Sequence, residues 1–167
     1  DQALTNIPIV SYDDDGIPLY NCDIIGLDDV TIKLENLHIT GNLVLGDRAN
    51  LINVHAGGSI IIGNNADTGH LVSGEDIIIG KDSEINNITA GSDVTIGSNA
   101  IIWNVFSGGN ITIGDTAKTR ELFALGSIEI GKNSISCKLK AGESITIQGG
   151  FSQQDKIPEF KSTFVFG

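Results

Sequence analysis

The sequence predicts an all-β fold: a single-stranded, three-sided parallel β-helix (β-solenoid) of about seven coils that repeats every 17 positions. Glycine recurs at this spacing, and two branched aliphatic residues, two positions apart, precede each glycine. A fixed short period is typical of solenoids, in which each repeat is one turn of a stacked structure. The glycines are Gly46, Gly63, Gly80, Gly97, Gly114 and Gly131, and Gln148 occupies the seventh place.

Inward positions come in three pairs per coil, which predicts three short strands per turn. Within a pair the residues are two apart, the spacing at which strand residues share a face. Successive pairs begin 6, 5 and 6 residues apart, so one turn closes as a triangle whose faces are parallel sheets. Because this spacing differs from the strict hexads of left-handed triangular helices, we expect a right-handed coil, the usual hand of parallel crossovers. In one coil the pairs are Ile60 with Ile62, Ala66 with Thr68, and Leu71 with Ser73.

Glycines mark two corners of this predicted triangle. One corner falls at the column of Gly63, and the other at the column of Gly57, Gly74 and Gly91. Glycine has no Cβ and adopts positive φ without a clash. We therefore expect these glycines to provide the left-handed backbone conformation of the corners.

A column of polar side chains on the outer surface predicts a hydrogen-bonded ladder. Asn36, Asn53, His70, Asn87 and Asn104 follow one another at the repeat spacing. Amides on successive stacked strands can bond to one another along the stacking axis. We expect this column to stabilise the rod.

The two ends differ from the repeats and predict caps. We divide the chain into an N-terminal cap at 1–29, the solenoid at 30–148 and a C-terminal cap at 149–167. An open solenoid end exposes strand edges and core, so repeat proteins close their ends with atypical segments. The aromatic C-terminus has a second interpretation, an interface with another chain, for which the self-association candidates are Phe160, Phe164 and Phe166.

Composition excludes several classes of protein. The formal charge is -11, from 10 basic and 21 acidic residues, and an acidic surface repels nucleic acid. No run of about 18 apolar residues is present, so we predict no membrane insertion. The chain begins at Asp1 and contains no Met, which favours a mature product or an excised domain. Cys22 and Cys137 lie near opposite ends of the array, too far apart for a disulfide.

The outward columns do not predict an enzyme. Catalysis on a β-helix needs carboxylates and basic groups that converge in a groove, and coils of constant length provide no wall for one. We therefore predict no catalytic residues and no cofactor. One alternative is a zinc site, because His38, His55 and His70 should project from one face of consecutive coils, about 4.8 and 8 Å apart. The other interpretation is three polar surface residues.

Four large apolar residues are predicted to lie together outside the core. Phe106 and Phe123 occupy one outward column on adjacent coils, and Ile101 and Trp103 are outward just across the corner. Contiguous exposed apolar surface usually marks a contact site. We expect this patch either to bind a glycan or protein partner, or to be covered by a terminal segment.

The segment Val94–Ala100 has the pattern V-x-I-x-x-x-A, which recurs at the repeat spacing. This pattern resembles the polymer-forming β-helix of bactofilins over about residues 30–148. The resemblance implies a β-helix that forms cytoplasmic filaments through its terminal coils. Coils such as Ala90–Ile96, with an Ala-Gly pair before the aliphatic residues, are also similar to filamentous-haemagglutinin-like surface proteins.

The function predicted first is a non-catalytic structural β-solenoid that serves as a surface scaffold, adhesin or assembly subunit, at a bacterial cell surface or secreted. Its expected partners are a further copy of itself, another surface protein or a glycan. The alternatives are a bactofilin-like cytoskeletal polymer, which would be cytoplasmic, and a glycan- or protein-binding module that uses the aromatic patch.

Overall fold

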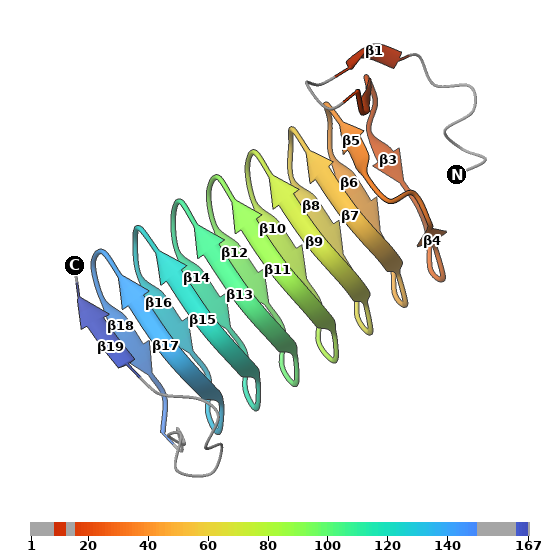
Figure 1. The fold of residues 1–167 in the computed structure, drawn as a ribbon. Coiled ribbons are helices and arrows are strands. Elements are labelled where there is room, and N and C mark those ends of the chain that lie inside the picture. The colour runs from red at the N-terminus through yellow and green to blue at the C-terminus, as the bar shows by residue number, and fades with distance from the viewer. Residues whose placement is uncertain (1–8, 13–15, 150–162, 167) are drawn as a thin grey trace.

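The computed structural model describes residues 9–12, 16–149 and 163–166, and these residues form a rod of stacked parallel strands (Figure 1). One side of the rod is an eight-stranded sheet of very short strands. Its strands are β3 (Ile24–Ile25), β6 (Leu43–Leu45), β8 (Ile60–Ile62), β10 (Ile77–Ile79), β12 (Val94–Ile96), β14 (Ile111–Ile113), β16 (Ile128–Ile130) and β18 (Ile145–Ile147).

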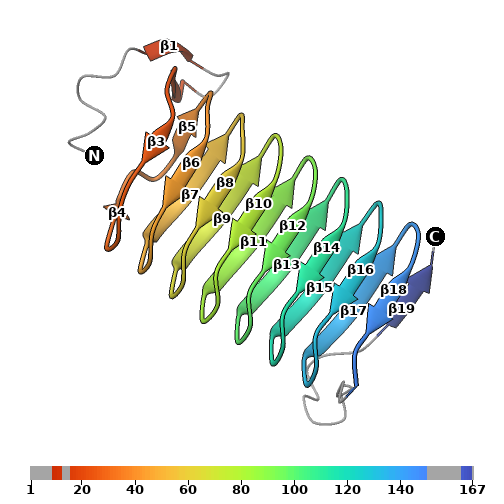
Figure 2. The same ribbon diagram turned by 180° about the vertical axis from the view of Figure 1, so that it is seen from behind.

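An eleven-stranded sheet forms the rest of the rod. Its repeating strands, from β7 to β17, each have seven residues and alternate along the chain with those of the first sheet (Figures 1 and 2). The strands are β1 (Ile9–Tyr12), β2 (Pro18–Tyr20), β4 (Thr31–Ile32), β5 (Leu37–Ile39), β7 (Asn50–Ala56), β9 (Asp67–Ser73), β11 (Glu84–Ala90), β13 (Ile101–Ser107), β15 (Lys118–Ala124), β17 (Ile135–Ala141) and β19 (Thr163–Phe166).

The register confirms the predicted β-solenoid and its period. Ile60 pairs with Ile77 and Ile77 with Val94, so paired residues on neighbouring strands are 17 positions apart. The first coil is longer, because Ile24 pairs with Leu43. The eight strands of the short-stranded sheet correspond to eight turns. The first of these turns begins at β3, a few residues before position 30, where the predicted solenoid starts.

The second and third predicted strands of each coil are joined into one bent strand. In β9, Thr68, Leu71 and Ser73 are buried, whereas Gly69 and His70 both face outward. Two consecutive outward residues bend the strand, and the parallel pairing skips position 69 and continues at His70. Only two residues separate the inward positions 68 and 71, so the backbone bends while its pairing with the neighbouring strands continues on both sides of the bend. We call the part before this bend the first arm and the part after it the second arm.

The core is the stack of inward residues from both sheets. The aliphatic positions of the short strands, such as Ile60, Ile77 and Ile111, have no measurable exposure. Each of these side chains lies between its equivalents in the coils on either side. A narrow interior of this kind is filled at near-crystalline density, which explains why its columns admit only branched aliphatic and small residues.

The glycines of the corners do not have the predicted role. Among the described residues, only Gly16 is a glycine with positive φ. In the described coils the left-handed positions lie at the corner of the Gly63 column, two residues after that column, and are held by non-glycine residues with φ between 51° and 64°. The glycines are needed because the coils approach closely: a Cβ on Gly91 would lie 2.3 Å from the carbonyl oxygen of Gly74. The left-handed residues are Asp29, Arg48, Asn65, Asp82, Asn99, Thr116 and Asn133.

Strands of the same chain extend the eleven-stranded sheet at both ends. At the N-terminal end β1 pairs antiparallel with β2, and at the C-terminal end β19 pairs parallel with β17. In this pairing Phe164 is in register with Leu139, and Phe166 with Ala141, two positions of the core. The edge of β17 is therefore occupied by its own chain. Phe160 lies outside the described residues, and self-association through Phe164 and Phe166 stays a prediction.

The eight-stranded sheet ends differently. Its terminal strands are β3 and β18, and no described strand pairs with their outer edges. Ile145 and Ile147 of β18 are only partly buried, whereas their equivalents Ile128 and Ile130 in the preceding coil are fully buried.

The described part of the chain contains no helix that is long and apolar enough to cross a membrane.

Candidate functional site

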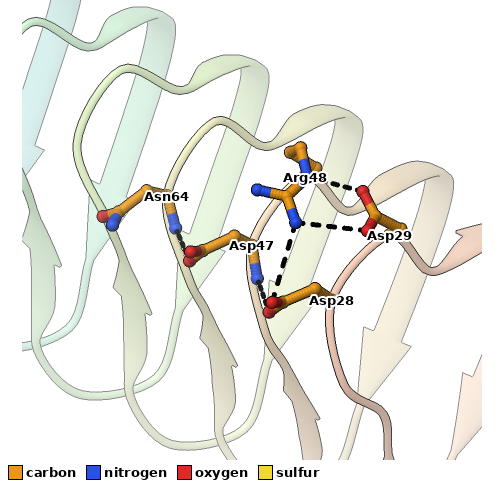
Figure 3. Close-up of polar contacts among 5 residues, drawn as sticks. All are labelled: Asp28, Asp29, Asp47, Arg48 and Asn64. Atoms are coloured by element: carbon orange, nitrogen blue, oxygen red, sulfur yellow. Dashed lines mark hydrogen bonds and ion pairs between the residues drawn. The ribbon is translucent and has the colours of Figure 1, made fainter.

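Polar side chains at the corners bind the backbone of the next coil. The Oδ1 of Asp28 accepts a hydrogen bond from the N–H of Asp47 at 2.8 Å, and the Oδ1 of Asp47 accepts one from Asn64 at 2.8 Å (Figure 3). Neighbouring corners of the rod show the same arrangement. These Asp and Asn residues therefore satisfy backbone groups that the turns leave open, which is a structural role.

Arg48 forms a cluster of exposed ion pairs at one corner. Its Nε lies 2.5 Å from Oδ1 of Asp29, and its Nη2 lies 3.1 Å from Oδ2 of Asp29 and 3.6 Å from Asp28 (Figure 3). The hydrogen bond from Arg48 lowers the pKa of the Asp29 carboxyl, and the same bond raises the pKa of Arg48. The two carboxylates that contact the guanidinium belong to the coil before Arg48, so these ion pairs link the first two coils.

The three histidines surround one hollow on the outer surface of the second arm. The hollow has a volume of about 330 Å³. The rings of His38 and His55 stack with centroids 4.2 Å apart and 14° between their planes. Burial, and then the nearby charge of His38, lower the pKa of His55. The polar residues that line the hollow are Asn36, His38, Asn53, His55 and His70.

The three histidines are not arranged around a common centre, and zinc binding by them stays a prediction. His70 bonds to Asn87 at 2.7 Å, and His38 and His55 stack face to face instead of pointing at a common centre. Metal ligation needs ring nitrogens that converge on one point. In the described part of the chain, no group of three or more His, Cys, Asp or Glu residues is placed to hold a metal ion. Histidine side chains that are stacked along the rod axis at the coil spacing contact each other through their ring faces, and their nitrogens do not point at one centre.

The predicted ladder of polar side chains is present in part. The Nδ2 of Asn104 donates to Oδ1 of Asn87 at 2.8 Å, and the Nδ2 of Asn87 lies 2.7 Å from Nδ1 of His70. With the amides in this orientation, which the network of hydrogen bonds assigns, Nδ1 of His70 accepts. A neutral His70 then carries its proton on Nε2. The ladder thus connects three coils and sets the tautomer of a histidine beside the hollow.

The predicted apolar patch lies on β13 and β15. Ile101 and Trp103 are on the first arm, with 41% and 45% of their surfaces exposed, and Phe106 and Phe123 are on the second arm, with 38% and 36% exposed. Phe106 and Phe123 meet edge to face with centroids 5.3 Å apart. The ammonium of Lys140 lies 5.0 Å from the centre of the Phe123 ring. The two phenylalanine rings therefore already contact each other and Lys140 within the chain. Binding of a partner by the patch stays a prediction.

Two surface features escaped the sequence prediction. Basic residues, among them Lys118, gather in the coils next to the aromatic patch, although the chain as a whole is strongly acidic. An exposed apolar row also runs along the first coils of the eight-stranded sheet, where Ile61 and Ile78 are 39% and 42% exposed. Both features could have been found in the sequence by comparing the outward residues that are 17 positions apart.

No disulfide joins Cys22 and Cys137, in agreement with their separation along the rod. Cys137 is buried, and its thiol lies 3.7 Å from the carbonyl oxygen of Thr119.

Comparison of the chain with protein-family models, with curated proteins and with solved structures gives no match.

Proposed function

We propose that the chain is a non-catalytic structural rod that acts as a scaffold, adhesin or assembly subunit at a bacterial cell surface or in the secreted fraction. The observation that carries the proposal is the uniform coil. From β6 to β18 every strand of the short-stranded sheet is 17 positions from its neighbour, without an inserted loop. A stack of identical turns holds its outer surfaces at fixed spacing, which is the property a scaffold needs.

The chemistry of the hollows supports a non-catalytic role. Among the described residues that line the histidine hollow, none carries a carboxylate, hydroxyl or thiol that could act together with the imidazoles as a nucleophile or as an acid–base partner. A second hollow of about 180 Å³, lined by Glu121, Leu122, Phe123, Lys138 and Lys140, contains one carboxylate. That carboxylate, Glu121, lies 3.6 Å from the ammonium of Lys138.

Complementation of a strain that lacks the gene tests the proposal. One variant replaces the histidines of the hollow (His38→Ser, His55→Ser and His70→Ser), and another lacks one coil, residues 77–93. If the rod itself is what the cell needs, both variants restore the wild-type phenotype. Loss of function in the histidine variant alone, with folding intact, would instead identify the hollow as a chemical site.

Location is tested separately. Antibody labelling and protease treatment of intact producing cells should reach a surface protein, and a secreted one should appear in the medium. Protection of the protein until the cells are lysed would contradict the surface role.

A bactofilin-like polymer is the second candidate, and the open ends of the eight-stranded sheet favour it. The outer edges of β3 and β18 have no partner strand in the described residues, so end-to-end stacking could continue the sheet. Negative-stain electron microscopy over a range of protein concentrations decides the matter: filaments support the polymer, and single rods at high concentration contradict it.

A binding module is the third candidate, and the exposed rings of the aromatic patch favour it. A glycan array with the wild-type chain and Trp103→Ala tests this function. Binding that the substitution abolishes supports it, and a blank array counts against glycan recognition.

A further inference from the structure

The outer surface of the first arm carries three rows of different character on three neighbouring strands. Glu84 of β11 pairs with Ile101 of β13, and Ile101 pairs with Lys118 of β15, so the three residues lie in one column. Trp103 lies beside Ile101, and Arg120 lies beside Lys118. We name these five residues the first-arm surface. Along the rod it is acidic, then apolar, then basic.

The charges of this surface do not neutralise one another within the chain. Glu84 and Lys118 are two strand spacings apart, about 10 Å, with the apolar row of β13 between them. The ion pairs in the described part of the chain join Arg48 to Asp28 and Asp29, and Lys138 to Glu121. Glu84, Lys118 and Arg120 are all exposed and take part in none of them.

We propose that the first-arm surface is a contact between two copies of this chain, packed side by side with their axes antiparallel. A two-fold axis through β13 would place β11 of each copy opposite β15 of the other. Glu84 of one copy then meets Lys118 and Arg120 of the second copy, and the same contact forms once more by symmetry. Trp103 and Ile101 meet their own equivalents at the axis. A two-fold contact requires a self-complementary surface of this kind.

The charges also select the orientation. In a parallel arrangement Glu84 would face Glu84 and Lys118 would face Lys118, and opposed like charges are unfavourable. The antiparallel arrangement replaces both repulsions by attractions and keeps the apolar row in the centre, with charged rows around it. Tryptophan and arginine are the residues that most often dominate the energy of protein contacts.

The size of the surface makes the contact a weak one. One side of a three-sided rod is narrow, and contacts that bury less than about 1,200 Å² in total belong to the transient class. The net charge of -11 on each copy also opposes association. At an ionic strength of about 0.15 M, charges are screened beyond roughly 8 Å, so distant repulsion fades while contacts at the surface remain.

Sedimentation equilibrium of the full chain over a wide range of concentrations tests the proposal. We expect a reversible monomer–dimer equilibrium for the wild type. Trp103→Ser should weaken dimerisation about tenfold or more, in the range of central contact residues. Glu84→Lys and Lys118→Glu should each weaken it as well, because each variant opposes like charges in its own homodimer.

Mixing the two charge variants gives the sharpest result. In a heterodimer of Glu84→Lys with Lys118→Glu, positions 84 and 118 again carry opposite charges in both contacts while Arg120 is unchanged, so the 1:1 mixture should dimerise more tightly than either variant alone. Lys132→Glu is the matched control, because it makes the same change of charge on an exposed corner residue away from the surface. Circular dichroism melts establish that each variant is folded.

Three outcomes would overturn the proposal: a wild type that stays monomeric at the highest concentration, a mixture that associates no better than its components, or a dimer unaffected by Trp103→Ser and both reversals. Assemblies that grow beyond the dimer and ignore these variants would point to the open ends of the eight-stranded sheet and would also count against it. A monomeric rod could still act as a scaffold, so this test is independent of the function proposed above.

Discussion

At the residue scale, the corners of the coil divide two tasks between neighbouring positions. An Asn, Asp, Arg or Thr residue adopts the left-handed conformation, as Asn99 does with a φ of 58°. Asn and Asp are the non-glycine residues that tolerate this conformation best. The glycines instead leave room for the coil beneath them. Their column is conspicuous in the sequence, but its cause is the contact between coils.

Gly91→Ala should therefore destabilise the rod. The added Cβ would lie 2.3 Å from the carbonyl oxygen of Gly74, and overpacking of this kind costs about 1–3 kcal/mol. Alanine also restricts the unfolded chain, which stabilises the folded state by only about 0.4–1 kcal/mol, so the destabilising clash dominates. Denaturant unfolding measures the difference. Gly149→Ala is the control, because a methyl group at Gly149 would meet nothing within 4 Å, and an equal loss in both variants would contradict the explanation.

The lowered pKa of His55 predicts a dependence of stability on pH. Burial and the neighbouring His38 disfavour the protonated ring in the folded chain, while the unfolded chain takes up the proton near pH 6.5. The free energy of unfolding should thus be highest above about pH 6.5 and fall as the pH decreases through that value.

His55→Asn should reduce this slope between about pH 7.5 and 5, as measured by urea unfolding at a series of pH values. His38→Asn should reduce it less, because burial, the larger cause, remains. Parallel curves for the wild type and His55→Asn would exclude His55 as the source.

At the scale of the element, the coil is held by a long bent strand and by ladders at its turns. In the turn before each short strand, the Oδ1 of Asp76 accepts from the N–H of Asp93 at 2.9 Å, and Asp93 accepts in the same way from Asn110 at 2.8 Å. Asn110 then accepts from Ser127 at 2.8 Å. Each turn therefore depends on the side chain of the coil before it, which explains why Asp, Asn and Ser dominate this column.

Asn110→Ala should cost about 0.5–1.5 kcal/mol, the usual net value of one hydrogen bond, because the N–H of Ser127 loses its acceptor. Asn110→Asp retains an acceptor oxygen and should be closer to the wild type. Thermal unfolding followed by circular dichroism compares the two. If alanine and aspartate melt at the same temperature, the ladder contributes nothing measurable at this turn.

At the scale of the whole molecule, the protein is a one-dimensional stack in which each coil contacts only its neighbours. Its stability is then close to a sum of coils and of the interfaces between them. Strands of the same chain extend the eleven-stranded sheet at both ends, whereas the eight-stranded sheet ends at β3 and β18. Association should therefore use either these edges or the sides of the rod.

Removal of residues 77–93 should leave a folded rod that is one coil shorter. The new junction joins Asp76 to Val94 in the way that Asp93 joins Val94 in the intact chain, and β8 would pair with β12 in the register it now has with β10. We expect a native-like circular dichroism spectrum and a somewhat lower denaturation midpoint, because one interface between coils is lost.

Removal of only the segment 77–85 is the control for this deletion. It shifts the register by half a coil and places outward residues in the core, so this variant should fail to fold. Equal behaviour of the two deletions would contradict the repeat architecture.

The sequence by itself determined the period, the inward columns and the β-solenoid. These follow from alternation within a few residues and from repetition, and both are local properties that can be read without knowing any contact. It also placed Ile101, Trp103, Phe106 and Phe123 correctly on the outside, because the residues next to an inward position in a strand face outward.

Only the tertiary structure decided how stacked coils affect one another. It joined the second and third strands into one, gave the corner glycines a role set by close approach, and stacked His38 on His55 instead of gathering three histidines around a metal ion. It also placed Glu84, Ile101 and Lys118 in one column of paired strands. The physical reason is that contacts between coils depend on the backbone separation and side-chain orientation of residues one full coil apart, which spacing alone does not specify.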